Sequence, residues 1–222
     1  MPFAAAIFDM DGTIANTMPW HAKAWESLWP ELGISVDHND FFRWSAGAIN
    51  AEIWPRLLGR LVPADELQHL GHRKETLYRE IARPSLAAIA GLDQLLDRFD
   101  ARGIALGVAT AAPPDNIAFV LDTLDLRRRF RHVVGAADIS RGKPDPEIFL
   151  TAAARLGVDP TRCLAFEDAP AGLESAKRAG MRVAALTTTL DRAALLALPD
   201  AARPHAIIDD FREFDIDSLA TP

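Results

Sequence analysis

Short apolar segments alternate with amphipathic helical patterns over the second half of the chain, and this alternation constrains the fold more than any other feature. The pattern at 91–102 has one apolar face and is closed by Gly103, as helices often are. The apolar run at 104–110 follows directly and has the length of a buried strand. Strands that alternate with helices in this way form parallel sheets covered on both faces. We therefore expect an α/β fold with a doubly wound parallel sheet, with strands at 3–8, 104–110, 130–135, 163–166, 182–186 and 206–208 and helices at 91–102, 115–126, 146–156, 171–179 and 191–198.

The residues between the first strand and this alternating region have a different pattern, in which apolar residues recur at helical spacing. Trp25 and Trp29 lie on one such stripe, and Pro30 predicts that the first helix kinks or ends near Trp29. A doubly wound domain interrupted by a helical insert accounts for the order of the patterns. We therefore predict a core domain made of residues 1–15 and 86–222 and an α-helical insert made of residues 16–85.

All five tryptophans fall in or at the edge of the insert, at Trp20, Trp25, Trp29, Trp44 and Trp54. The simplest role for such rings is to fill the interior of a small helical bundle. Trp44 differs, because it stands next to a Ser-Ala-Gly sequence in a predicted loop. We therefore expect Trp44 to be the tryptophan best placed to contact a ligand.

The first predicted strand ends in two carboxylates, Asp9 and Asp11, followed by Gly12. Two acids followed by glycine could simply form a turn. Ligands in open α/β sheets, however, bind at the edge where the strands have their carboxyl ends. One carboxylate could attack a phosphoester and form an aspartyl-phosphate, while the other protonates the departing alkoxide. Repulsion between neighbouring carboxylates raises one pKa, which favours a protonated Asp11.

Composition restricts the class of protein and its partners. The 222 residues, 49% hydrophobic and 25% charged, suit one large domain or a domain with a small insert. No apolar run approaches the roughly 18 residues that a membrane span needs, and the N-terminus lacks the pattern of a secretory signal. A formal net charge of -7 disfavours nucleic acid and anionic membranes as partners. A phosphate substrate remains compatible with this charge, because a bound divalent cation can invert the local field.

The single cysteine, Cys163, cannot form an internal disulfide, which is consistent with a reducing cytoplasm. It lies in a predicted strand without a His/Cys cluster nearby in sequence, so we interpret it as a small core residue. We expect a cytoplasmic monomer.

The stretch Ile7-Phe8-Asp9-Met10-Asp11-Gly12-Thr13 resembles the opening motif of the haloacid dehalogenase-like hydrolase superfamily, whose phosphatases share the pattern hhhhDxDGT. The resemblance implies that Asp9 is the nucleophile and that Asp11 is the general acid and then the base. The dehalogenase branch expels halide, needs no such acid and typically lacks the second Asp. Asp11 therefore favours phosphoryl transfer.

Further motifs of the superfamily follow in order. Thr110 ends a predicted strand, where it could simply cap a turn; the resemblance implies that it binds phosphoryl oxygens together with nearby backbone N–H groups such as that of Ala111. The sequence Lys143-Pro144-Asp145-Pro146 is similar to the third motif, whose lysine holds the phosphoryl group and the nucleophile. The pattern is not a nucleotide P-loop, since proline stands where that loop needs Ser or Thr.

Glu167 and Asp168 end another predicted strand and match the fourth motif. Two adjacent acids at this position could simply cap the following helix, with no role in metal binding. The resemblance implies that they hold Mg²⁺ with Asp9 and Asp11, the direct ligands being the Asp9 and Asp168 carboxylates and the Asp11 carbonyl, with Glu167 acting through water. It also implies that the Asp9 strand is central, between the strands ending at Thr110 and Asp168.

Within the superfamily the whole chain is most similar to the branch of β-phosphoglucomutase and sugar-phosphate phosphatases, which has a helical cap. The cap residues that match this branch are Thr17, His21, Trp25, Lys74 and Tyr78. We expect these residues, together with Trp44, Gly47 and Asn50, to bind or enclose substrate. The mutase carries an arginine three residues after the loop glycine, where it grips the distal phosphate of a sugar bisphosphate. Here that position is Asn50, a neutral amide that cannot replace a guanidinium group on a phosphate.

These observations predict a Mg²⁺-dependent phosphatase that hydrolyses small phosphomonoesters, with sugar phosphates as the expected substrates. A hexose phosphomutase would use the same first half-reaction and remains the alternative enzyme. A binding protein on an inactive hydrolase scaffold is disfavoured, because all five core motif residues are present: Asp9, Asp11, Thr110, Lys143 and Asp168.

Overall fold

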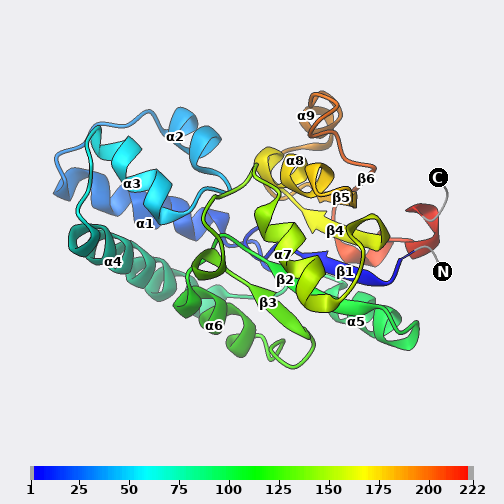
Figure 1. Ribbon diagram of the computed structural model, residues 1–222. Helices are drawn as coiled ribbons and strands as arrows, with labels where there is room; N and C mark the ends of the chain where they lie inside the picture. The colour runs from blue at the N-terminus through cyan, green and yellow to red at the C-terminus, as the bar shows by residue number, and fades with distance from the viewer. Residues whose placement is uncertain (1–2, 220–222) are drawn as a thin grey trace.

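The computed structural model describes residues 3–219 and contains one six-stranded sheet within that range, with strand order β3-β2-β1-β4-β5-β6 (Figure 1). All neighbouring strands are parallel. This order is the doubly wound arrangement expected from the alternating sequence pattern. The strands are β1 (Ala5–Phe8), β2 (Ala105–Ala109), β3 (His132–Val134), β4 (Cys163–Glu167), β5 (Arg182–Leu186) and β6 (Ala206–Ile208).

The central strand β1 lies between β2 and β4, with Phe8 opposite Val108 on one side and Phe166 on the other. All four of its residues are buried, because helices cover both faces of the sheet. The chain order reverses here, since β2 and β4 both return to the sides of β1. The residues that follow these three strands therefore meet at a topological switch point.

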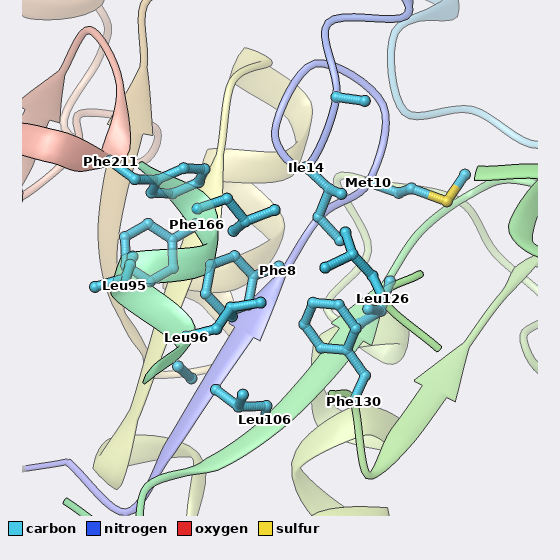
Figure 2. Packing of buried hydrophobic residues seen from close by; sticks show 14 of the residues in the cluster. Phe8, Met10, Ile14, Leu95, Leu96, Leu106, Leu126, Phe130, Phe166 and Phe211 are labelled. Carbon is cyan, nitrogen blue, oxygen red and sulfur yellow. The ribbon is translucent and has the colours of Figure 1, made fainter. Parts of the chain in front are cut away.

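Helices cover the sheet in two layers: α5 (Leu92–Ala101), α6 (Pro114–Thr123), α7 (Glu147–Leu156), α8 (Pro170–Arg178) and the short α9 (Arg192–Leu196). Successive side chains of β1 enter opposite layers, as the twofold period of a strand requires. Phe8 enters the layer shown in Figure 2, where it stacks on Phe166 with ring centroids 4.6 Å apart. Ile7 enters the other layer with Cys163, which is fully buried, as predicted for a core cysteine.

The insert contains four α-helices among its described residues, gathered at one side of the core in Figure 1: α1 (Met18–Glu31), α2 (His38–Ser45), α3 (Asn50–Leu58) and α4 (Ala64–Ala82). We call these helices and their loops the cap. They enclose a separate hydrophobic cluster that includes Trp25, Trp29 and Trp54. The expected packing of tryptophans inside a small bundle is therefore confirmed for these three rings.

Two linkers join the cap to the core, and they lie side by side. Ala15 forms a bridge with Ala88, and the Ile89 N–H donates to the Ile14 carbonyl at 2.9 Å. The boundaries between core and insert at residues 15/16 and 85/86 stay a prediction. Residues 1–2 and 220–222, which belong to the predicted core ranges, lie outside the described residues. Among residues 3–219, no helix has the length and apolar character needed to cross a membrane.

Candidate active site

A cavity of about 610 Å³ lies between the cap and the carboxyl ends of the sheet strands. Core residues that line it include Asp9, Thr110 and Lys143, and cap residues include His21, Asn50 and Lys74. A volume of this size suits a small organic ligand. Residues that were predicted as site residues from separate sequence motifs therefore line the same cavity.

Asp9 follows β1 directly and is 6% exposed. Its backbone N–H donates to the Phe166 carbonyl at 2.9 Å, which continues the β1–β4 pairing and fixes the start of the turn. The Lys143 ammonium donates to Asp9 Oδ1 at 2.5 Å and to Glu167 Oε1 at 2.6 Å. One buried cation therefore joins the ends of β1 and β4.

The other acids of this cluster are also held by defined donors. Glu167 Oε2 accepts the backbone N–H groups of Asp168 and Ala169 at 2.7 and 2.8 Å. Asp168 accepts hydroxyl hydrogen bonds from Thr13, at 3.2 Å, and from Thr189. These bonds fix the two carboxylates in different directions, with Glu167 turned toward Lys143.

Gly12 is required by the close approach of Asp168. Its φ of +91° lies in the region that glycine adopts without strain. A Cβ added at Gly12 would come within 2.1 Å of Asp168 Oδ2. The Asp-Gly-Thr turn therefore makes room for the carboxylate at the end of the neighbouring strand.

Three buried carboxylates share the single ammonium of Lys143. Burial raises the pKa of Asp9 well above its ordinary value despite Lys143. Burial, and then the charge of Glu167, raise the pKa of Asp168 to about 7. Burial alone would lower the pKa of Lys143, but the charges of Asp9 and Glu167 outweigh that effect and raise it. Three carboxylates around one ammonium give an excess of negative charge when all are ionised, and the raised pKa values reflect the cost of that state.

This excess and the oxygen-only donor set fit Mg²⁺, which prefers hard oxygen ligands and keeps several waters. Within residues 3–219, no group of three or more His, Cys, Asp or Glu side chains converges as a metal-binding set. The predicted direct ligands include only two carboxylates, those of Asp9 and Asp168, and the third is the Asp11 backbone carbonyl. A set of that composition does not need three converging side chains.

Asp11 turns away from Asp9 and toward the cap. Its Oδ1 accepts the Thr17 hydroxyl at 2.6 Å and lies 3.4 Å from His21 Nε2. Lys74 Nζ lies 2.7 Å from His21 Nδ1. Because an ammonium group only donates, Nδ1 must accept and Nε2 must carry the proton that points to Asp11. Lys74, His21 and Asp11 therefore form a connected chain of polar groups.

This environment corrects the expected protonation of Asp11. Burial raises the pKa of Asp11, but the hydrogen bonds from His21 and Thr17 and the positive charge of Lys74 outweigh that effect and bring the pKa below its ordinary value. The expectation of a raised pKa was wrong because it considered only the neighbouring Asp9. The acid of the pair with the raised pKa is Asp9.

Thr17 and Tyr78 do not line the cavity but support residues that do. Thr17 is fully buried beneath the Asp11 carboxylate. Tyr78 stacks on the His21 ring, with centroids 3.7 Å apart and planes 7° from parallel. Thr17 and Tyr78 therefore support Asp11 and His21, which line the cavity.

Thr110 and Ala111 line the cavity at the end of β2. The Thr110 hydroxyl accepts the Ala112 N–H at 3.1 Å, which is the turn-capping role that the sequence also allowed. An accepted hydrogen bond leaves the hydroxyl proton able to donate to a ligand oxygen. The capping and ligand-binding roles are therefore compatible.

Three predicted cap residues lie in the α2–α3 region. Gly47 and Asn50 line the cavity, and the Lys143 N–H donates to the Gly47 carbonyl at 3.2 Å. Trp44 belongs to the last turn of α2, so the prediction of a loop was wrong. Its ring packs against the Arg56 guanidinium at 4.1 Å and does not line the cavity. The amphipathic pattern of residues 38–45 extends the helix through Trp44 and turns its ring toward α3.

Trp25 lines the cavity with part of its ring but is only 3% exposed. Lys74 Nζ lies 5.2 Å from its centroid. The ring packs against Phe41 and Trp54 in the cap cluster, with centroids 5.0 and 4.9 Å apart. Trp25 therefore belongs to the cap cluster and also lines the cavity.

The polar lining residues without a predicted role include Glu75, Asn116, Thr188 and Thr189. The two threonines follow β5, so the strand-end rule that selected Asp9 also applies to them. Asn116 lies in the first turn of α6, shortly after Thr110. Glu75 has no such signal, because it lies within the long helix α4.

Comparison with known proteins identifies the family. Residues 3–180 match the family described as haloacid dehalogenase-like hydrolase. The chain is a haloacid dehalogenase-like hydrolase. The order of motifs around the cavity is consistent with this membership.

Relatives of this hydrolase include phosphatases and a mutase. It is 33% identical to the validoxylamine A 7'-phosphate phosphatase of Streptomyces hygroscopicus subsp. limoneus over 204 residues, covering 87% of this chain and 90% of the relative. It is 33% identical to the fructose-1-phosphate phosphatase of Escherichia coli K12, covering 81% of this chain and 94% of the relative. The crystal structure of a β-phosphoglucomutase from Clostridium difficile is also similar, with a TM-score of 0.83, 25% identity and coverage of 98% and 95% of the two chains.

Proposed function

We propose that this hydrolase is a Mg²⁺-dependent phosphatase of small phosphomonoesters, with phosphorylated sugars as its substrates. The observation that carries the proposal is the pair of acids after β1. Asp9 is bound to Lys143 on the core side of the cavity, and Asp11 is bound to Thr17 and His21 on the cap side. A nucleophile and a proton donor are thereby held apart in one cavity. The phosphatases among the relatives support the same reaction.

In the first step an Asp9 carboxylate oxygen attacks phosphorus, and the bond from phosphorus to the substrate oxygen breaks. Lys143 offsets the repulsion between the carboxylate and the phosphate, and Thr110 with the Ala111 N–H binds the phosphoryl oxygens. Asp11 gives its proton to the departing alkoxide. A bound phosphate dianion raises the pKa of the nearby Asp11, which favours the protonated form needed at this point.

In the second step the Asp11 carboxylate takes a proton from water, whose oxygen attacks phosphorus. The bond between phosphorus and Asp9 breaks, and inorganic phosphate leaves. Asp9, Asp168 and the Asp11 carbonyl would hold Mg²⁺, with Glu167 acting through water. When bound, the ion supplies positive charge that stabilises the charge on the phosphoryl oxygens.

A hexose phosphomutase is the second candidate, because it would share the first step. It must hold a doubly phosphorylated sugar tightly enough to exclude water from the aspartyl-phosphate. The mutase arginine position is Asn50, whose amide donates to Glu75 at 3.3 Å. Arg43 lines the cavity, but its side chain is 74% exposed and paired with Asp40. This arrangement favours the phosphatase.

The decisive experiment supplies β-glucose 1-phosphate with Mg²⁺ and catalytic glucose 1,6-bisphosphate, and follows glucose 6-phosphate and free phosphate together. We expect any turnover to appear as free phosphate. Stoichiometric conversion to glucose 6-phosphate with little phosphate released would establish the mutase instead. A screen of phosphorylated metabolites, with and without Mg²⁺, then identifies the substrate and separates an enzyme from a binding protein.

The proposal also places the enzyme in the cytoplasm as a monomer that does not bind nucleic acid or membranes. The net charge of -7 supports the absence of nucleic-acid and membrane partners, and the single cysteine supports a reducing compartment. Size-exclusion chromatography with light scattering tests the monomer.

A further inference from the structure

Glu75 is a buried carboxylate in the wall of the cavity. It has no role in the proposed reaction. It lies on α4 and is 5% exposed. It lines the cavity on the cap side, away from the cluster of Asp9, Lys143 and Asp168. A buried acid is expected to have compensating partners, and those partners indicate its role.

Side chains from three helices donate to this carboxylate. The Lys74 ammonium lies 3.1 and 3.2 Å from its two oxygens. Asn116 Nδ2, from α6 of the core, donates to Oε2 at 2.6 Å. Asn50 Nδ2, from α3, donates to Oε1 at 3.3 Å. Three groups from different elements thus hold Glu75 in its charged form.

The orientation of the Asn116 amide is fixed independently. Arg79 Nη1 donates to Asn116 Oδ1 at 2.8 Å, and a guanidinium group can only donate. The other end of the amide must therefore be the N–H₂ group that faces Glu75. The side chains of Lys74, Asn116 and Asn50 therefore all donate hydrogen bonds to the Glu75 carboxylate.

Gly71, one helical turn before Glu75, makes room for Asn50. A glycine within a helix destabilises it by roughly 0.5–1 kcal/mol relative to alanine. A Cβ at Gly71 would come within 3.3 Å of Asn50 Nδ2. The small residue allows the Asn50 amide to lie against α4 and reach the carboxylate.

The network determines the charge that the cap wall presents to a ligand. Lys74 is the buried cation of this wall, and Glu75 balances its charge at hydrogen-bond distance. A second anionic group on a ligand would therefore meet the Glu75 carboxylate, and among the described residues that line the cap side of the cavity it would meet no buried ammonium or guanidinium group that lacks a carboxylate partner. The amides of Asn50 and Asn116 provide neutral polar atoms suited to hydroxyl groups.

We infer that Glu75 is a specificity-determining residue, which admits phosphomonoesters with a neutral, hydroxyl-bearing end and excludes those with a second anionic group. This inference rests on the proposed function for its substrate class. It concerns the end of the ligand that does not react, so it predicts relative affinity and not the rate of the chemical step.

The test measures binding, so that it does not depend on turnover. Isothermal titration calorimetry with Mg²⁺ compares glucose 6-phosphate and glucose 1,6-bisphosphate on the Asp9→Asn variant, with and without Glu75→Gln. The amide substitution removes one negative charge and leaves Lys74 without the carboxylate to which it is hydrogen-bonded. We expect the affinity ratio to shift toward the bisphosphate by at least about tenfold, or about 1.4 kcal/mol.

Two further variants control for charge and for folding. Glu80→Gln removes the same charge from an exposed position of α4 and should leave the ratio unchanged. Glu75→Asp keeps the charge and should retain the preference for the monophosphate. Because both ligands are measured on the same preparation, a partly unfolded variant lowers the active fraction for both and leaves the ratio interpretable.

An unchanged ratio in Glu75→Gln, an equal shift in Glu80→Gln, or tighter binding of the bisphosphate by the parent would each overturn the inference. Binding of neither sugar phosphate to the parent would also overturn it. Release of phosphate by the wild-type chain from an aryl phosphate is measured separately. Failure of that assay would count against the phosphatase while leaving the binding result to decide the role of Glu75.

Discussion

Lys143→Met should destabilise the folded protein strongly in the absence of Mg²⁺. The side chain is 2% exposed and donates to Asp9 at 2.5 Å and to Glu167 at 2.6 Å. Methionine has a similar length, so the substitution removes the charge and leaves three buried carboxylates without their shared cation. Breaking a buried ion pair by removing one partner costs about 3–5 kcal/mol. For a chain of this size each kcal/mol changes Tm by about 2–4 °C, so we expect a fall of roughly 6–20 °C.

Differential scanning calorimetry with chelator and then with excess Mg²⁺ measures this effect. A divalent cation restores positive charge to the cluster, so Mg²⁺ should raise the Tm of Lys143→Met and recover part of the loss. Lys23→Met, at an exposed position of α1, is the matched control and should change stability by less than about 0.5 kcal/mol. A fall in Tm for Lys143→Met of less than about 2 °C without Mg²⁺ would refute the charge argument.

Three further predictions concern single residues. Asp9→Asn should abolish phosphate release and leave the far-UV circular dichroism unchanged, because an amide is nearly isosteric but a poor nucleophile; a residual rate above a few per cent would contradict its role. Asp11→Asn should slow hydrolysis of a sugar phosphate by about 10²–10⁴-fold and that of an aryl phosphate much less, since phenolate needs little protonation; equal losses would argue against general acid catalysis. Burial raises the pKa of Cys163 to about 11, so its thiol should react with Ellman's reagent at pH 8 only after denaturation, and rapid labelling of the folded protein would show that the thiol is accessible.

Local patterns were sufficient to predict the layers of the fold and the residues at the strand ends. The strand signal of residues 104–110 and the helix signal of residues 91–102 each depend on neighbours in sequence, and both elements are present as β2 and α5. The acids after β1 and β4 also follow from local position, because parallel strands bring their carboxyl ends to one edge. Trp44 shows the limit of such patterns, since the Ser-Ala-Gly sequence after it suggested that Trp44 lies in a loop, whereas α2 continues to Ser45.

Contacts between distant residues decided the rest. The sequence placed Asp11 beside Asp9 and so predicted a raised pKa, but folding brings Thr17, His21 and Lys74 to Asp11 and reverses the sign. The meeting of Glu75 with Asn50 and Asn116 has no local signal at all, because these side chains come from three helices and two parts of the molecule. Periodicity reports which face of an element is buried, whereas the partner of a buried charge is set by the packing of one element on another.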